Sequence, residues 1–463
     1  MPPFPPGTQL ALWYDWARTL GAADPADFRA RVAPLTPAHW AEFWPFAVQH
    51  GLAPWFHSQF RIQNSEFRIQ NSEFPPPDLL PPPVHCSPFT VHSSPPSPLR
   101  TNALTNSCTN ELTNSRTNAL LQKHYLYNAI ANIRAFHELA EILDHANAAG
   151  LPVIVLKGVH LAACVYPDPA LRVMADTDLL VHPADLPAMQ SIMAALGYRA
   201  AEDIQSHHHI TYRHAEKKMV EVHHMLWRDI HQHGLDNFWR QATPFQLEGR
   251  QALVLAPADA FLHLALHASA YHRLFRGLRS LLDMLLLARA SRQPEFWSNV
   301  RQAADQTGFA SSLPNLLYLI ENLLNTTLPN RPTARLSEGS TVPLSASLLR
   351  DGCQRALATA STSKTESLNF ASFIRAKSSS ARWAMLRSRL LPNPQEVAQA
   401  CGIPNTARVW LHYPGYIAAR ACRLLQLLAA ALFPRWRKAR LAEGDAELDF
   451  TAAFGPSPPP AVT

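Results

Sequence analysis

The sequence predicts an α+β protein with a small mixed β-sheet core, flanking helical segments and a disordered insertion. Two observations carry this prediction. Residues 119–250 alternate between helical and strand patterns, in the order helix, strand, helix, strand, helix and two further strands. On either side, residues 8–56 and residues 251–330 show the three-to-four-residue apolar spacing that is typical of helices.

The N-terminal helical segment, residues 8–56, is rich in tryptophan and contains a helix start in which Thr36 caps and Pro37 opens the first turn. Residues 57–118 differ from the preceding helical segment in composition. The heptapeptide FRIQNSE occurs twice in tandem, followed by a proline-rich run and repeated Thr-Asn pairs without helical periodicity. We expect this insertion to be disordered. The alternative, a partner-binding linker, is not supported by any partner-specific composition.

The polar residues 331–365 are expected to link the helical domain to a C-terminal helical segment at residues 366–447. Within that segment the apolar run at residues 424–433 is too short to span a bilayer and is interpreted as a core helix. We therefore expect no membrane span. A helix lying on a membrane surface is the minor alternative.

Charge and cysteine content restrict the expected partners and compartment. The chain has 41 Lys and Arg residues against 35 Asp and Glu residues, a formal net charge of +6. This excess is small, and no dense basic stripe carries interleaved aromatic residues, so nucleic acid is not the expected partner. The six cysteines are scattered without a CxxC pair, which favours a reducing, cytoplasmic location over a disulfide or structural zinc framework.

Residues 151–198 hold the most informative pattern. A strand, VIVLK, runs into a helix at Lys157-Gly158, and the free N–H groups of such a turn favour an anion such as a phosphate. The next strand, ADTDLLV, carries Asp176 and Asp178 at i and i+2, so both carboxylates should lie on one face. Two converging carboxylates can hold a divalent cation, although a surface turn or helix cap would also use aspartates. A phosphate cradle beside them suggests metal-dependent phosphoryl or nucleotidyl transfer.

Several segments in fixed order resemble a known family: LKG, YPDPALR, DTDLLV, a helix ending in LGY, VEVHHMLW, and a His-rich helical segment ending in LR…LLD. Over roughly residues 120–330 the chain is similar to the uncharacterised nucleotidyltransferase family of the DNA polymerase β-like superfamily. It departs from the wider superfamily at the first turn, where Lys157-Gly158 replaces the usual Gly-Ser. A serine contact to the phosphates is therefore not assumed, and whether Lys157-Gly158 replaces the Gly-Ser turn in full is left open.

The resemblance implies a third metal-site carboxylate on a neighbouring strand, which maps to Glu221, where relatives more often have Asp. Alternation in VEVHH places Glu221 and His223 on one face. Asp176, Asp178 and Glu221 are then the expected catalytic and metal-binding residues for Mg²⁺ or Mn²⁺, with Glu221 as the candidate base. If Glu221 only faces solvent, the pair binds metal without a base.

Further residues have two interpretations each. Lys157 either pairs with phosphate oxygens or reaches solvent. Arg172 either clamps a phosphate or acceptor group or pairs with one of the aspartates. His263 and His267 have the i, i+4 spacing of zinc ligands, but without an HExxH glutamate they are expected to pack toward the sheet or cleft. Among the histidines, His223 alone is expected to contact substrate or support the site.

The resemblance thus implies an enzyme that moves a nucleoside monophosphate from a nucleoside triphosphate, with ATP the first candidate, to a hydroxyl of a small-molecule or protein acceptor, releasing pyrophosphate. Lys157, Gly158, Arg172 and His223 are the expected nucleotide-binding residues. The alternative is a non-catalytic protein that keeps the fold as a partner-binding module. The acceptor and the oligomeric state cannot be predicted from these patterns.

Overall fold

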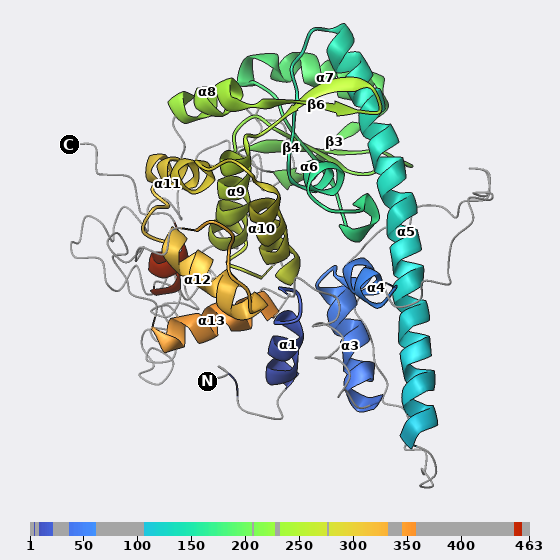
Figure 1. Cartoon of the computed structure of the whole chain (residues 1–463). Helices are drawn as coiled ribbons and strands as arrows, with labels where there is room; N and C mark the ends of the chain where they lie inside the picture. The colour runs from blue at the N-terminus through green and yellow to red at the C-terminus, as the bar shows by residue number, and fades with distance from the viewer. Residues whose placement is uncertain are drawn as a thin grey trace, which may run out of the picture.

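A computed structural model describes residues 4, 9–21, 37–61, 106–205, 208–226, 232–275, 277–331, 345–357 and 449–455. Its architecture is a mixed β-sheet with many helices around it, which confirms the predicted α+β class (Figure 1). The strands are β1 (Ile154–Val155), β2 (Thr177–Leu180), β3 (Arg199–Gln205), β4 (His209–Arg213), β5 (Val220–His223), β6 (Thr243–Leu247) and β7 (Arg250–Val254). The α-helices are α1 (Gln9–Ala17), α3 (Pro37–Gln49), α4 (Ala53–Arg61), α5 (Asn106–Ala148), α6 (Lys157–Cys164), α7 (Leu186–Ala195), α8 (Gln232–Gln241), α9 (Pro257–Leu266), α10 (Leu278–Ala290), α11 (Phe296–Gln306), α12 (Leu313–Leu324) and α13 (Ala346–Leu357). Short 3₁₀ turns η2 (Pro169–Leu171) and η3 (Pro183–Asp185) and a π-helical turn η4 (His267–Tyr271) are also present, and residues 449–454 are helical.

The seven strands are ordered β3-β4-β5-β2-β1-β7-β6. β2 is parallel to β5 and antiparallel to β1, and β1 is parallel to β7, so the sheet is mixed, as predicted. Three strands, β3, β6 and β7, were not predicted. The β6–β7 hairpin crosses the expected domain boundary at residue 250, because its two-residue turn, Glu248-Gly249, brings β7 back to pair with β6.

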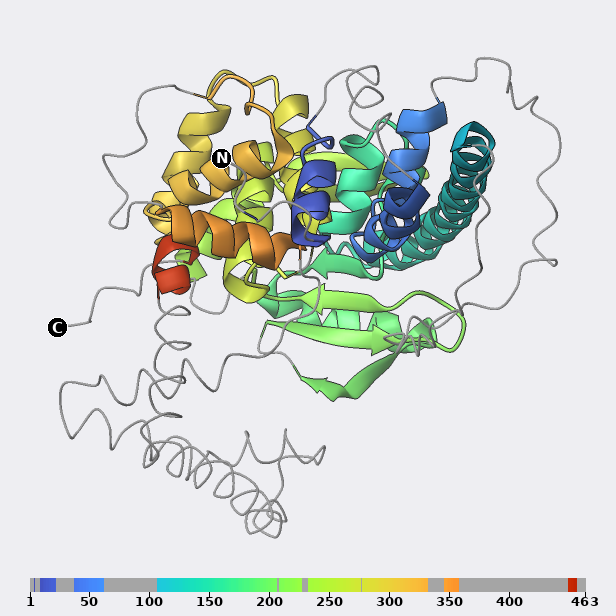
Figure 2. The ribbon, with the colours of Figure 1, turned by 90° about the horizontal axis from the view of Figure 1, so that it is seen from below.

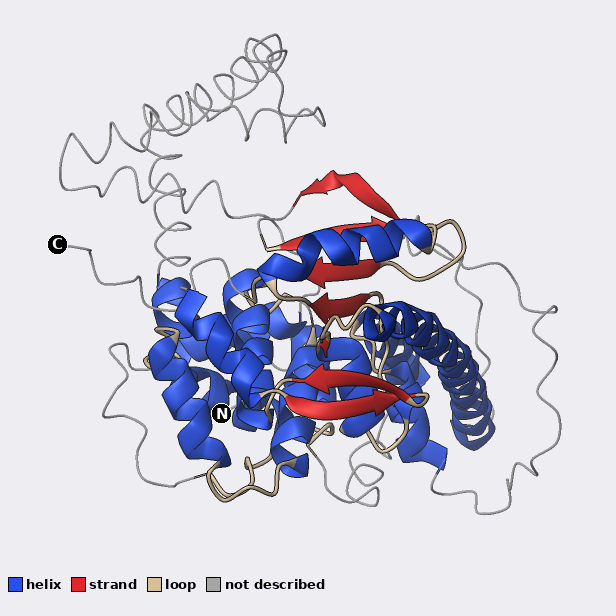
Figure 3. Ribbon diagram, turned by 90° about the horizontal axis from the view of Figure 1, so that it is seen from above, coloured by secondary structure: helices blue, strands red, loops and turns tan. Residues whose placement is uncertain are grey.

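The two faces of the sheet bury different side chains. Val155, Leu179 and Val222 pack with residues of α5 and α7 in one core, whereas Ile154 and Leu180 belong to the core that contains α9 and α10. Figure 3 shows the helices on both sides of the strands. Because side chains alternate along a strand, Asp178 and Glu221 lie on the face of Leu180, toward α9.

Helix α5 corrects the expected extent of the insertion. It begins at Asn106, inside residues 57–118, and α4 also extends into that range, to Arg61. The Thr-Asn repeats lack apolar periodicity, but a helix that is already nucleated propagates through weak helix formers at little cost. Contacts of α5 with α3 and α4 add to this (Figure 1). Residues 62–105 lie outside the described residues.

The expected linker at residues 331–365 contains a helix, α13, which packs on α1 and α12 (Figure 2). Its buried residues Cys353, Ala356 and Leu357 follow helical spacing, a short apolar pattern within a polar stretch. The C-terminal helical segment predicted at residues 366–447 lies outside the described residues. No helix within the described ranges is long and apolar enough to cross a membrane.

Candidate metal and nucleotide site

Asp178 and Glu221 are direct neighbours across two parallel strands. The register of β2 and β5 pairs Asp178 with Glu221 and Leu180 with His223. Val220 and Val222 point into the opposite core, so Glu221 and His223 share the face of Asp178, as alternation predicted. The two carboxylates come from separate segments and are brought together by sheet pairing alone.

Asp176 directly precedes β2 and lies within electrostatic range of both other acids. Burial, together with the negative charges of Asp178 and Glu221, raises the pKa of Asp176 to about 6, while Lys157 and Arg279 act in the opposite direction. Asp178, Glu221 and His223 form one of two groups among the described residues whose donor atoms converge within 4.8 Å, and Asp176 belongs to neither group. The three predicted acids therefore interact electrostatically, but only Asp178 and Glu221 place their carboxylate oxygens close together.

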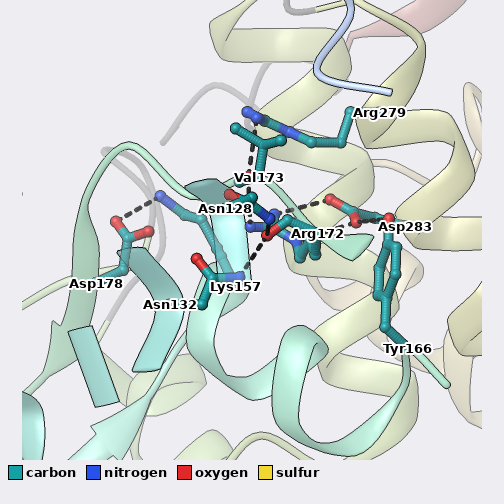
Figure 4. Close-up of polar contacts among 9 residues, drawn as sticks. All are labelled: Asn128, Asn132, Lys157, Tyr166, Arg172, Val173, Asp178, Arg279 and Asp283. Carbon is teal, nitrogen blue, oxygen red and sulfur yellow. Dashed lines mark hydrogen bonds and ion pairs between the residues drawn. The ribbon is translucent and has the colours of Figure 1, made fainter. Parts of the chain in front are cut away.

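Lys157 is tied to this site. Its Nζ lies 2.9 Å from Asp178 Oδ1, and the lysine side chain is 10% exposed, so the ammonium does not simply reach solvent. Lys157 is the first residue of α6 and has a φ of 37°, in the left-handed region, where the strand turns into the helix. This turn aims the side chain toward β2 (Figure 4).

Gly158 allows close packing at the same turn. A Cβ at this position would lie 3.0 Å from Arg172 Nη1 and 3.2 Å from Met174 Sδ. Both neighbours belong to the segment that leads into β2. The glycine therefore lets the start of α6 approach that segment closely.

His223 completes the surroundings of Asp178. Its Nε2 lies 3.0 Å from Asp178 Oδ1 and 3.6 Å from Glu221 Oε2. Burial of Asp178 opposes its ionisation, but Lys157 and the hydrogen-bonded His223 outweigh burial and hold the pKa of that carboxyl well below its usual range. Asp178 is therefore a carboxylate at neutral pH.

Arg172 is paired with an aspartate that the sequence patterns did not single out. Its Nε and Nη2 donate to the two carboxylate oxygens of Asp283 on α10, at 3.1 and 2.9 Å. Asn128 and Asn132 of α5 donate to the carbonyl oxygen of Arg172, at 3.0 and 2.8 Å (Figure 4). The guanidinium is thus a structural partner of Asp283 rather than of Asp176 or Asp178.

Arg279 is a second cation beside the acids. Its Nη1 donates to the carbonyl oxygen of Val173, at 2.9 Å, and its charge lowers the pKa of Asp176 (Figure 4). Burial and the nearby charge of Arg172 lower the pKa of Arg279 itself. The LR of the LR…LLD pattern is the signal that could have identified this residue.

Two histidines of α9 and η4, His263 and His267, lie within electrostatic range of Asp178. Burial and the charge of Lys157 lower the pKa values of His263 and His267 well below the usual value, and Asp178 acts on both in the opposite direction. His267 Nε2 lies 3.1 Å from His272 Nε2. Neither His263 nor His267 belongs to a metal-ligand group among the described residues. Their packing toward the site is as predicted, and the zinc interpretation gains no support.

This face gathers groups that could bind a divalent cation and a phosphate: carboxylates on adjoining parallel strands, a helix start with a lysine, and a second cation nearby. A comparison with known families identifies the class of protein. The sequence profile of an uncharacterised nucleotidyltransferase family matches residues 90–325, and the chain belongs to this family. No curated protein matches the chain.

Proposed function

We propose that the protein is a metal-dependent nucleotidyltransferase that transfers a nucleoside monophosphate from a nucleoside triphosphate, with ATP the first candidate, to a hydroxyl of a small-molecule or protein acceptor. The acceptor oxygen forms a bond to the α-phosphorus as the bond to pyrophosphate breaks. The observation that carries the proposal is the in-register pairing of Asp178 with Glu221, with Asp176 electrostatically joined to both.

The donor set fits a hard divalent cation. Carboxylate oxygens are the ligands that Mg²⁺ and Mn²⁺ prefer, and the raised pKa of Asp176 reflects repulsion and burial that a bound cation would relieve. Asp176, Asp178 and Glu221 are the residues that would hold it. Such an ion neutralises phosphate charge and acidifies an attacking hydroxyl.

The remaining residues have distinct tasks in this proposal. Lys157 can exchange its ion pair with Asp178 for one with a phosphate oxygen once that carboxylate ligates metal. Arg279 supplies positive charge near Asp176 for a phosphate. Glu221, at 18% side-chain exposure the most accessible donor of its group, is the proposed acceptor of the hydroxyl proton. His223 orients Asp178, and Arg172 holds the segment that precedes Asp176.

The test is calorimetric titration of the full-length protein with ATP, GTP, CTP and UTP, each with magnesium and with chelator. We expect saturable binding of at least one nucleotide that depends on magnesium. No binding under any condition would contradict the proposal and favour the non-catalytic, partner-binding alternative, with which the tight Lys157–Asp178 pair is also compatible.

A further inference from the structure

Three imidazoles gather beside the carboxylates, where β4 meets β5. His209 is the first residue of β4 and pairs in register with His223. The ring centroids of His209 and His223 are 4.9 Å apart, and that of His208 is 4.5 Å from His209 and 5.6 Å from His223. The nitrogen donor atoms of the three rings lie within 4.8 Å of one another.

The backbone fixes His208 at this point. The N–H groups of His224 and Met225 both donate to the carbonyl oxygen of His208, at 3.0 and 3.3 Å. Sheet pairing fixes His209 and His223 in the same way. The three rings are therefore grouped by rigid main-chain interactions, not by a flexible loop.

Glu221 adds an oxygen donor next to two of the imidazoles. Its Oε1 lies 3.8 Å from His209 Nε2, and its Oε2 lies 3.6 Å from His223 Nε2. Four donors that surround a tetrahedral ion at bond lengths of about 2.0–2.2 Å are separated from each other by roughly 3.3–3.6 Å. The two Glu221 separations involve different carboxylate oxygens and lie at or slightly above the upper end of this range. The three imidazoles form the convergent group, and Glu221 could join it as a fourth ligand after a small shift of its side chain.

Glu221 lies too far from His209 and His223 to form hydrogen bonds with them. Separations of 3.6 and 3.8 Å between Glu221 and the two imidazoles exceed the hydrogen-bond range. The Nδ1 atoms of His209 and His223 are buried and have no hydrogen-bond partner among the described residues. His223 uses its Nε2 for the hydrogen bond to Asp178, so its Nδ1, like that of His209, is a ring nitrogen that hydrogen bonds in the described part of the chain leave unused.

We propose that His208, His209 and His223, with Glu221, bind a borderline transition-metal ion of the Zn²⁺ or Co²⁺ class. Imidazole nitrogen suits these ions, whereas magnesium requires oxygen donors. This site goes beyond the proposed nucleotidyl transfer and needs no nucleotide. It shares Glu221 with the proposed magnesium site, and its His223 is also the hydrogen-bond partner of Asp178, so the two sites are tested separately.

The experiment uses full-length, chelator-treated protein titrated with Co²⁺ in the absence of nucleotide and read by visible absorption, followed by displacement with Zn²⁺. The variant is His208→Gln/His209→Gln. The matched control is His137→Gln/His145→Gln, which removes two exposed histidines of α5. Circular dichroism and thermal unfolding of the metal-free proteins show whether each variant folds, and His209→Gln alone replaces the double variant if that does not.

We expect one Co²⁺ per chain with the intense absorption of a four-coordinate ion, unchanged in the control. Loss of ligands should weaken affinity by at least about 100-fold, since loss of supporting residues alone costs up to that much. Absence of this absorption in the wild-type protein, or wild-type affinity in the folded variant, would overturn the proposal.

Asp176→Asn separates this site from the proposed function. It should leave the Co²⁺ spectrum unchanged while weakening magnesium-dependent ATP binding. A Co²⁺ spectrum in a protein that binds no nucleotide would leave the histidine site standing and refute nucleotidyl transfer. Nucleotide binding without Co²⁺ absorption would refute the histidine site and leave the proposed nucleotidyl transfer standing.

Discussion

Arg172 and Asp283, separated by 111 residues in the sequence, form a buried two-pronged ion pair. Tyr166 donates a third hydrogen bond to Asp283 Oδ1, at 2.8 Å. The pair joins the segment before Asp176 to α10, and it links the two family-like patterns YPDPALR and LR…LLD. Both patterns therefore contribute to holding the acids in place rather than to contacting a ligand through Arg172.

The stability of this pair gives the first prediction. Asp283→Asn should lower the free energy of unfolding by about 3–5 kcal/mol, because it leaves a buried guanidinium without its counter-charge. Tyr166→Phe removes a single hydrogen bond and should cost about 1 kcal/mol. Denaturant titration of the three proteins measures both values. Equal losses for the two variants would show that the ion pair does not hold the segment.

The second prediction separates transfer from binding at Glu221. Glu221→Gln should keep magnesium-dependent triphosphate binding through Asp176 and Asp178 but slow pyrophosphate release at least 100-fold, about 3 kcal/mol in the barrier. Glu221→Asp should retain much of the rate because it keeps a carboxylate. Pyrophosphate release, with an acceptor or with slow hydrolysis in its place, decides the matter. Equal rates for wild type and Glu221→Gln would remove Glu221 from the mechanism.

The third prediction concerns pH. Burial and the neighbouring acids raise the pKa of Asp176 from 3.8 to about 6. Between these values the folded protein keeps a proton that the unfolded chain has lost, so the contribution of Asp176 to stability falls as pH rises. Asp176→Asn cannot titrate. In chelator it should be more stable than wild type by about 1–3 kcal/mol above pH 6, with the difference vanishing near pH 4.

Denaturant unfolding of both proteins across this pH range provides the measurement. The low pKa of Asp178 has the opposite effect on the pH dependence. Because the charges of Asp176 and Asp178 act on each other, the difference between the two proteins reports the titration of Asp176 together with this interaction. A stability difference that does not change with pH would mean that Asp176 is not in the charged surroundings described.

Local periodicity explains which parts of the site could be predicted. Alternation along a strand is set by neighbouring residues, so it placed Glu221 and His223 on one face correctly. The LR…LLD pattern contains Arg279 and Asp283, but it does not say what they contact. Their contacts with Arg172 and Val173 depend on the docking of α10, more than 100 residues away in the sequence, which no local pattern encodes. The convergence of His208 with His223 likewise depends on the pairing of β4 with β5.

The sequence contains a pattern that predicts the β6–β7 hairpin, although these strands were missed. Glu248 and Gly249 both have positive φ, 48° and 82°, as a two-residue hairpin turn requires, and apolar residues alternate on each side in FQLEGRQALVL. The start of α5 has no such sequence pattern, because Thr and Asn have low helix propensity. The helix contacts α3 and α4, which are distant in the sequence from its start.

The most direct test of the central claim is the affinity for ATP, with and without magnesium, of wild type, Asp176→Asn and the control Asp305→Asn, which alters an exposed acid on α11. Asp176 is the better target than Asp178, since Asp178→Asn would leave Lys157 buried without its counter-charge. We predict that magnesium strengthens binding to wild type and control, and that Asp176→Asn loses this gain by about 10–100-fold. The same magnesium-dependent affinity in all three proteins would contradict a metal–nucleotide site at these carboxylates.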